Sequence, residues 1–138
     1  MICFLLLVGI DQYFKHLALQ GFAKTNFFLF KLTLLKNHGV MLGFLSHLSS
    51  IWIAITQITL LMVIYFMKPP KWVMTFCLAG GLSNLIDRLY YGYIVDYIHF
   101  HIHDYHWPTV INLADLYLCI GISLWLYDQY NQSNDPVL

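Results

Sequence analysis

Long apolar stretches alternate with more polar segments along the whole chain. They cover roughly residues 2–19, 48–67, 72–90 and 111–127. Each stretch approaches the roughly 20 residues that a helix needs to cross a bilayer. The pattern predicts an all-α membrane protein with four transmembrane helices, folded as a single domain over residues 1–138. The polar tail after residue 127 is expected to fray.

A different periodicity appears between the first two apolar stretches. Within residues 24–37, the apolar positions Phe30, Leu32 and Leu34 alternate with polar ones, which is typical of a half-exposed strand. The glycine-containing segment 37–46 that follows is expected to turn. Because a single strand cannot span a bilayer, we expect a small extracytoplasmic β-platform between helices 1 and 2. By contrast, we expect a loop rich in Tyr and His at residues 91–110.

The composition supports a membrane location. Hydrophobic residues make up 59% of the 138 residues and charged ones only 10%, whereas soluble domains carry about 25% charged residues. The formal net charge is zero, which gives no electrostatic argument for binding nucleic acid. Residues 1–10 lack a basic start and a cleavage site, so we interpret them as the beginning of a retained helix. The cysteines lie far apart without a CxxC motif and are expected to be small buried hydrophobes: Cys3, Cys77 and Cys119.

Polar side chains interrupt the apolar stretches near their ends, at spacings that place them on one helix face. These pairs are Asp11 with Lys15, Asn84 with Arg88 (Asp87 lying beside them), and Asn112 with Asp115. Ionisable groups at the edge of a membrane span are costly and suggest a functional site. For Asp11 and Lys15, two interpretations remain open: an internal ion pair that closes one end of the helix, or a brace for a polar site.

The positive-inside rule assigns an orientation to the chain. The basic segment 68–71 joins the second and third stretches and would be cytoplasmic. The polar residues would then gather at the outer face, together with an interfacial aromatic belt formed by Tyr90, Tyr91, Tyr93, Tyr97, Tyr105 and Trp107.

Asp96 and Asp115 are the candidate catalytic residues. Two neighbouring carboxylates cannot both ionise cheaply, so one keeps its proton and the pair can hold a water molecule. One carboxylate can then take a proton from this water while the other donates a proton to a carbonyl oxygen, which is acyl hydrolysis without a covalent intermediate. The candidate donors that would hold the substrate are Asn37, Asn84, Arg88 and Asn112.

A histidine cluster supports a competing hypothesis. His99, His101, His103 and His106 alternate along the 91–110 segment and could bind Zn²⁺ or Cu²⁺. The chain would then be a small membrane metal-binding or transport protein. A surface segment with incidental histidines is the simpler interpretation, and Asp104 is expected to be a solvated loop residue. A catalytically idle structural relative is a third possibility, which intact Asp96 and Asp115 argue against.

The order of these polar residues resembles lipoprotein signal peptidase, also called signal peptidase II. The family's D-Q-x-x-K motif corresponds to residues 11–15, its Asn-x-Gly motif to residues 37–39, its G-N-x-x-D-R-x-x-x-G-x-V-x-D motif to residues 83–96, and its F-N-x-A-D motif to residues 111–115. The chain differs from the usual pattern at Ser83, at Ile111 and at residues 40–42. These differences affect none of the acids and amides assigned to the site.

The resemblance implies a membrane aspartyl endopeptidase with a catalytic dyad at Asp96 and Asp115. The supporting or substrate-binding residues would be Asn37, Asn84, Arg88, Asn112, Asp11 and Asp87, and no metal or cofactor would be needed. The substrate would be a prolipoprotein, cleaved just before its diacylglyceryl-modified Cys. The enzyme would be a multi-pass monomer of the bacterial cytoplasmic (inner) membrane, with its active site towards the outer face.

Overall fold

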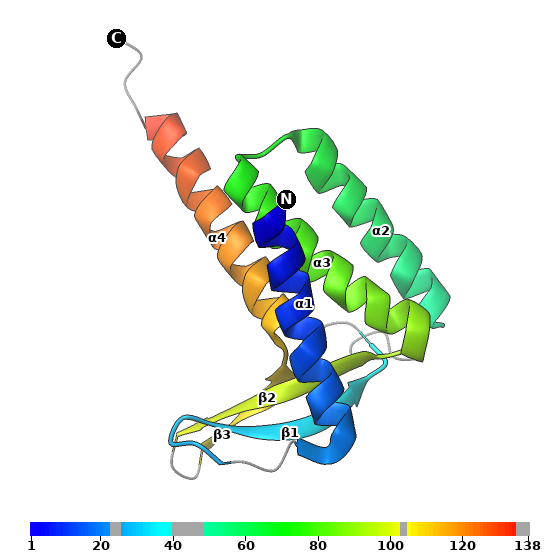
Figure 1. Cartoon of the computed structure of the whole chain (residues 1–138). Helices are drawn as coiled ribbons and strands as arrows, with labels where there is room; N and C mark the ends of the chain where they lie inside the picture. Colours follow the sequence, from blue (N-terminus) through cyan, green and yellow to red (C-terminus); the bar gives the residue numbers. More distant parts are fainter. Residues whose placement is uncertain (23–25, 40–48, 103–104, 135–138) are drawn as a thin grey trace.

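Four helices stand over one small antiparallel sheet (Figure 1). The computed structural model describes residues 1–22, 26–39, 49–102 and 105–134. The helices are α1 (Ile2–Leu17), α2 (Ser50–Met67), α3 (Lys71–Tyr91) and α4 (Leu113–Asn134). A π-helical turn, Ala18–Phe22, continues α1. The sheet lies across one end of the helices, and the α2–α3 connection lies at the other end.

The sheet has the strand order β1-β2-β3. Its strands are β1 (Phe30–Asn37), β2 (Ile94–Ile102) and β3 (Tyr105–Ile111). Our expectation of a platform formed between helices 1 and 2 is therefore wrong in part, because the segment between α3 and α4 supplies two of the three strands. This segment is rich in the β-branched and aromatic residues that favour strands. β3 accommodates Pro108 because it is an edge strand, where a missing N–H breaks no ladder.

Two other expectations need correction. The tail continues as helix α4 to Asn134 and does not fray within the described residues. Of the cysteines, Cys77 is buried as expected, but Cys3 and Cys119 are exposed. The expected strand is present from Phe30 onwards, whereas residues 23–25 and 40–48 of its flanking segments lie outside the described residues.

Helix α3 is the centre of the bundle, since it contacts each of the other three helices. Its glycines allow this close approach. A Cβ atom on Gly80 would clash with the backbone carbonyl oxygen of Ala114 in α4, and one on Gly81 would clash with the side chain of Leu61 in α2. The small-residue patch predicted on this helix is therefore where two neighbouring helices pack.

Two segments are long and apolar enough to cross a membrane: Ile2–Gly21 and Ser50–Met67. Only 17% and 11% of the 18-residue apolar stretches within them are buried in the protein. They therefore do not resemble the core helices of a soluble domain. The other two helices, α3 and α4, carry more polar residues. In α3 these polar residues are buried against the rest of the protein: Ser83, Asn84, Asp87 and Arg88.

The glycine contacts predict unequal effects for three matched substitutions. Gly80→Ala should destabilise the fold by about 1–3 kcal/mol, because the backbone carbonyl of Ala114 cannot move aside. Gly81→Ala should cost less, since the flexible Leu61 side chain can rotate. Gly9→Ala meets no atom within 4 Å and serves as the control. Thermal unfolding in detergent measures this order; an equal effect of the three would contradict the packing described.

Candidate active site

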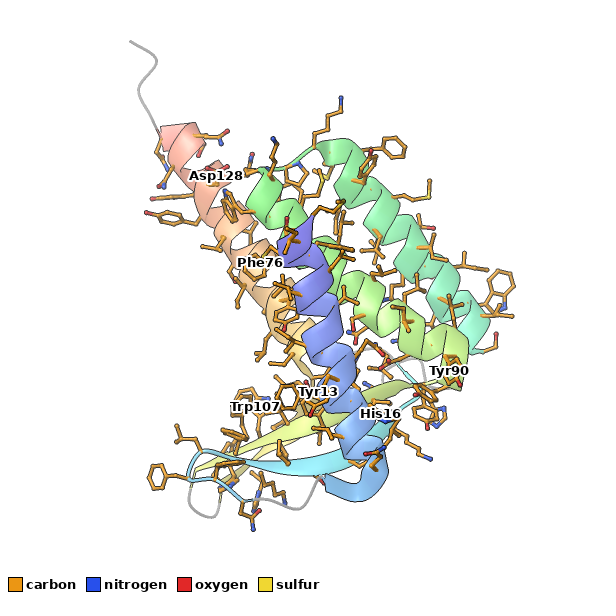
Figure 2. The ribbon with its side chains drawn as sticks, viewed as in Figure 1. Tyr13, His16, Phe76, Tyr90, Trp107 and Asp128 are labelled. Atoms are coloured by element: carbon orange, nitrogen blue, oxygen red, sulfur yellow. The ribbon has the colours of Figure 1, made fainter. Side chains whose placement is uncertain are left out.

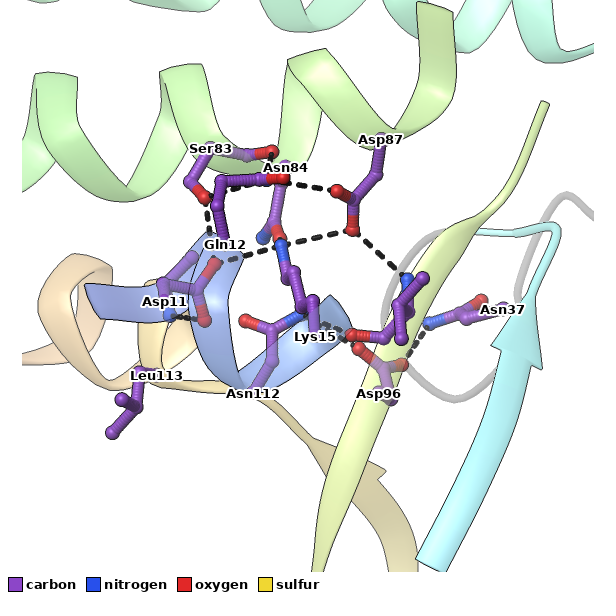
Figure 3. A network of polar contacts seen from close by, with 12 residues as sticks. Asp11, Gln12, Lys15, Asn37, Ser83, Asn84, Asp87, Asp96, Asn112 and Leu113 are labelled. Atoms are coloured by element: carbon purple, nitrogen blue, oxygen red, sulfur yellow. Dashed lines mark hydrogen bonds and ion pairs between the residues drawn. The ribbon is translucent and has the colours of Figure 1, made fainter. Parts of the chain in front are cut away.

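The sequence-predicted residues converge where the sheet meets the helices (Figure 3). Asp96 lies on β2, opposite Leu35 of β1. Asp115 lies in the first turn of α4. Asn84, Asp87 and Arg88 come from the end of α3 that is nearest the sheet. These three elements thus contribute to one polar cluster, which is largely closed to solvent.

A reciprocal capping box fixes Asp115. The backbone N–H of Asn112 donates to Asp115 Oδ2 at 3.1 Å, and the backbone N–H of Asp115 donates to Asn112 Oδ1 at 2.9 Å. The pairing of an N-cap side chain with an acidic side chain three residues later is a common start for a helix. Here it also holds the Asp115 carboxylate in one orientation. Its other oxygen, Oδ1, accepts a hydrogen bond from Asn84 Nδ2 at 2.8 Å.

Asn112 also reaches the other candidate acid. Its side-chain Nδ2 donates to Asp96 Oδ1 at 2.7 Å, and to Asn84 Oδ1 at 3.1 Å. Asp96 Oδ2 accepts from Asn37 Nδ2 at 2.9 Å. One fully buried amide therefore joins Asp96 and Asp115.

Lys15 supports the cluster through ion pairs with two further carboxylates, those of Asp11 and Asp87. The buried Lys15 ammonium lies 2.8 Å from Asp11 Oδ2 and 2.9 Å from Asp87 Oδ2, and it donates to Asn84 Oδ1 at 2.9 Å. All three of its protons therefore have acceptors. Asp87 Oδ2 also accepts from the backbone N–H of Val95 at 3.0 Å, which ties α3 to β2. Both interpretations of Asp11 and Lys15 hold, because they form an ion pair and also brace the site.

Arg88 is buried and only partly satisfied. Its Nη2 donates to the carbonyl oxygen of Gly39 at 2.8 Å. Its Nε and Nη1 have no hydrogen-bond partner among the residues that the structure describes. A buried donor without a partner carries a desolvation cost, so these two N–H groups are suited to a ligand that supplies an oxygen.

Burial changes the proton affinity of Asp96. Its pKa is raised from an ordinary 3.8 to about 7, first by burial and then by the neighbouring charge of Asp115. The hydrogen bonds from Asn37 and Asn112 and the charge of Lys15 oppose this rise but do not cancel it. Asp96 can therefore keep or lose a proton near neutral pH, as a general acid or base requires.

Three members of the cluster were not among the site residues predicted from sequence. Gln12 donates to Asp87 Oδ1 at 2.9 Å and to Ser83 Oγ at 3.0 Å. Ser83 Oγ donates to Asp11 Oδ2 at 2.6 Å, and Tyr97 donates to Asp11 Oδ1 at 3.2 Å. Gln12 belongs to the D-Q-x-x-K motif at residues 11–15, which was the available signal for this residue. Tyr97 was assigned to an interfacial aromatic belt, which is wrong, since the side chain is only 3% exposed.

The histidines lie away from this cluster, on the strands β2 and β3. The His106 ring centroid lies 5.5 Å from that of His99 and 5.7 Å from that of His101. His103 and Asp104 are outside the described residues. Within the described residues, no group of three His, Cys, Asp or Glu side chains is placed to hold a metal ion.

Two solved structures of bacterial membrane enzymes share this fold. One superimposes with a TM-score of 0.84 over 98% of this chain and 89% of its own, at 24% identity. The other has a TM-score of 0.75 over 93% of this chain and 90% of its own, at 25% identity. The fold is thus that of a class of bacterial membrane enzymes, and in this chain it encloses a buried carboxylate cluster.

Sequence comparison is more specific. Residues 3–131 match the sequence model of the family described as Signal peptidase (SPase) II. The lipoprotein signal peptidase of Thermodesulfovibrio yellowstonii is 37% identical over 131 residues, which cover 88% of each chain. That of Francisella tularensis subsp. mediasiatica is 34% identical over 136 residues, which cover 86% of this chain and 83% of the relative. The chain belongs to the signal peptidase II family.

The raised pKa of Asp96 predicts how stability depends on pH. Between about pH 3.8 and 7 the folded protein keeps a proton that the unfolded chain releases. The free energy of unfolding should therefore fall as pH rises through this window. Asp96→Asn lacks this proton uptake. The melting temperature of the variant minus that of the wild type should therefore increase as pH rises from 5 to 8, measured at intervals of about one pH unit. Melting curves in detergent across this range measure the difference.

The control for this experiment is Asp128→Asn, near the end of α4 that is remote from the sheet (Figure 2). It should follow the wild-type pH dependence. A difference between Asp96→Asn and wild type that does not change with pH would contradict the assignment of the raised pKa to Asp96.

Asn112→Ala tests the amide that joins the two acids. The change removes one donor to Asp96 and one acceptor for the backbone of Asp115, and losing one such positioning donor typically lowers turnover by about 10²–10³-fold. We expect a folded protein with strongly reduced peptide cleavage. Asn134→Ala, at the far end of the same helix, is the control. Turnover close to wild type in Asn112→Ala would remove this residue from the site.

Proposed function

We propose that this chain is an aspartic endopeptidase that processes prolipoproteins, with Asp96 and Asp115 as the catalytic dyad. Its membership in the signal peptidase II family supports processing of prolipoproteins. We propose further that cleavage falls just before the diacylglyceryl-modified Cys of the precursor. The dyad assignment rests on one observation: the number of hydrogen bonds that each carboxylate of the cluster already accepts from the protein.

The four carboxylates of the cluster differ in how many further hydrogen bonds they can accept. An ionised carboxylate can accept about four hydrogen bonds. Asp11 accepts four: from Ser83, Lys15, Tyr97 and the backbone N–H of Ala114. Asp11 therefore has no acceptor position left for a substrate.

Asp87 is nearly as occupied. It accepts from Gln12, Lys15 and the backbone N–H of Val95. Asp11 and Asp87 are therefore suited to holding the architecture.

Asp96 and Asp115 are held but not saturated. Among the described residues, each of their four carboxylate oxygens accepts one hydrogen bond: from Asn112 and Asn37 on Asp96, and from Asn84 and the backbone of Asn112 on Asp115. Each oxygen keeps a second acceptor position. These positions are what a bound water molecule and a substrate carbonyl need, which supports the choice of these two acids.

The charges of the cluster favour a shared proton. Lys15 and Arg88 bring two positive charges to a site that contains four carboxylates. With all four ionised, a buried excess of negative charge would remain, and retaining one proton relieves it. The proton is assigned to the pair as a whole, because interacting acids titrate together.

The proposed reaction follows from a singly protonated pair. The ionised carboxylate takes a proton from water, and the water oxygen forms a bond to the scissile carbonyl carbon. The protonated carboxylate gives its proton to the carbonyl oxygen, which yields a neutral tetrahedral intermediate. When this intermediate collapses, one of its hydroxyl groups returns a proton to the ionised carboxylate, the C–N bond breaks, and the departing nitrogen receives a proton from the protonated carboxyl of the pair. Arg88 Nε and Nη1 would donate to carbonyl oxygens of the substrate.

We propose that all four helices cross the bilayer and that the protein is a monomeric, single-domain enzyme of the bacterial inner membrane. The polar residues that lower the apolar character of α3 are buried inside the protein, away from lipid. The basic α2–α3 connection would be cytoplasmic. Since the sheet lies at the opposite end of the helices (Figure 1), the active site would face the outer side. Lipid would surround the exposed faces of α1 and α2.

The dyad is tested with Asp96→Asn and Asp115→Asn. An amide cannot accept the proton of water or return it, whereas the Asn side chain is nearly isosteric and can still accept a backbone N–H in the capping box. Each variant should insert and fold but lose cleavage of a diacylglyceryl prolipopeptide in detergent, followed by gel shift. The double variant should be no worse than either single variant, because residues that act as a unit are not additive.

The same assay separates the alternatives. Substantial turnover by a well-folded single variant would falsify the dyad, and no cleavage by the wild-type protein would indicate a catalytically idle relative. Changing His99, His101, His103 and His106 together to Gln should leave cleavage largely intact, and EDTA should not inhibit. Inhibition by EDTA that Zn²⁺ reverses would replace the aspartyl mechanism with a metal-dependent one.

A further inference from the structure

The first turn of α4 carries Asp115, and side chains satisfy every N–H group in it. The first four N–H groups of any helix lack partners within the helix. In α4 the capping box satisfies two of them, at Asn112 and Asp115. The N–H groups of Leu113 and Ala114 instead donate outside the helix, to Tyr97 Oη at 3.3 Å and to Asp11 Oδ1 at 3.2 Å.

These two external acceptors are bonded to each other. The Tyr97 hydroxyl donates to Asp11 Oδ1 at 3.2 Å, so Asp11, Tyr97 and the α4 backbone form a closed hydrogen-bonded ring. Asp11 is itself held from its other oxygen by Ser83 Oγ at 2.6 Å and by Lys15 at 2.8 Å. The end of α4 is thereby tied to α1, α3 and β2 at once.

Tyr97 is suited to this position. Its ring stacks on Phe14 of α1 with centroids 6.2 Å apart, and the side chain is almost fully buried. Burial and the adjacent Asp11 raise the pKa of the phenol above its usual value. The hydroxyl therefore stays protonated and acts as a donor to Asp11 and an acceptor for Leu113, not as a base.

The position of Tyr97 next to Asp96 in sequence matters as much as its contact with α4. Successive side chains of a strand point to opposite faces, so Asp96 and Tyr97 of β2 project away from each other. Asp96 is one proposed catalytic acid, and Tyr97 bonds to the helix turn that carries the other acid. A single dipeptide of β2 thus fixes one carboxylate directly and the position of the second through a hydroxyl.

We propose that Tyr97 is a positioning residue of this enzyme, which acts with Asp11 as an external cap that holds Asp115 at its working distance from Asp96. The proposal rests on the proposed dyad. The proposal predicts that the Tyr97 hydroxyl controls turnover more than substrate affinity. The reason is that the hydroxyl contacts neither of the two proposed catalytic acids nor their open acceptor positions. A purely structural tyrosine would affect stability alone.

Tyr97→Phe removes the hydroxyl and keeps the ring on Phe14. Turnover (kcat) should fall about tenfold, as expected for one hydrogen bond to a charged group, while KM changes less than about twofold. The limb of the pH–kcat/KM profile that reports the acid pair of the free enzyme, near pH 7 in wild type, should move to lower pH as Asp115 becomes less closely held. Tyr117→Phe is the matched control, because Tyr117 is a largely buried residue of α4 whose hydroxyl makes no hydrogen bond among the described residues.

A double-mutant cycle tests whether the hydroxyl acts through Asp11. In an Asp11→Asn background, the effect of Tyr97→Phe on kcat should shrink by at least about threefold, since the two side chains form one unit. An equal fold-change in both backgrounds would overturn the proposal. So would a Tyr97→Phe enzyme with wild-type kcat and pH profile.

Hydrogen exchange provides a readout that does not depend on activity. Amides 113 and 114 should exchange at least about tenfold faster in Tyr97→Phe than in wild type, because their external acceptors are lost or displaced, while the rest of α4 is unchanged. Unchanged protection at these amides would overturn the external cap. If the wild-type protein cleaves no prolipopeptide, the proposed function fails, and the exchange experiment still decides whether the cap exists.

Discussion

The buried ammonium of Lys15 is the interaction on which the rest of the site depends. A lone charge in such a place would be very costly, and breaking a buried pair leaves an uncompensated charge. Here the ammonium has two carboxylates and one amide oxygen as acceptors, all within 3 Å. These acceptors come from α1 and α3, so satisfying one charge brings the two helices together. Asn84, held in this way, then orients its amide toward Asp115.

The carboxylates next to Lys15 accept more hydrogen bonds from the protein than the carboxylates farther from it. Next to Lys15, Asp11 is filled by protein donors and Asp87 nearly so, whereas Asp96 and Asp115 farther along the network keep open acceptor positions among the described residues. The saturated carboxylates are locked and therefore make a rigid support. The open ones can meet water and substrate without losing their own orientation. Preorganisation of this kind avoids reorganisation during the reaction.

Much of the fold could be predicted from the sequence, because apolar length and helical spacing are local signals. The i, i+3 and i, i+4 pairs lie on shared faces as expected. β1 forms where a strand was predicted, but its burial does not alternate with a period of two, and its register shifts between Leu32 and Leu35. The strands β2 and β3 were missed, since residues 94–98 of β2 are buried on both faces and the pattern of β2 does not alternate clearly. Tyr97 and Ser83 were missed as site residues because their roles come from Asp11, which lies more than 70 residues away in sequence.

The start of α4 shows why folding and catalysis are difficult to separate in this protein. Any helix beginning in a dry environment must satisfy its first N–H groups with side chains. At this helix the capping carboxylate is also a proposed catalytic acid, and its partner Asn112 also holds the second acid. The requirement that a helix beginning among buried groups be capped therefore already places a carboxylate, with a fixed orientation, beside the polar cluster. The proposed catalysis then needs only a second acid on an adjacent strand, and we propose that Asp96 of β2 is this acid.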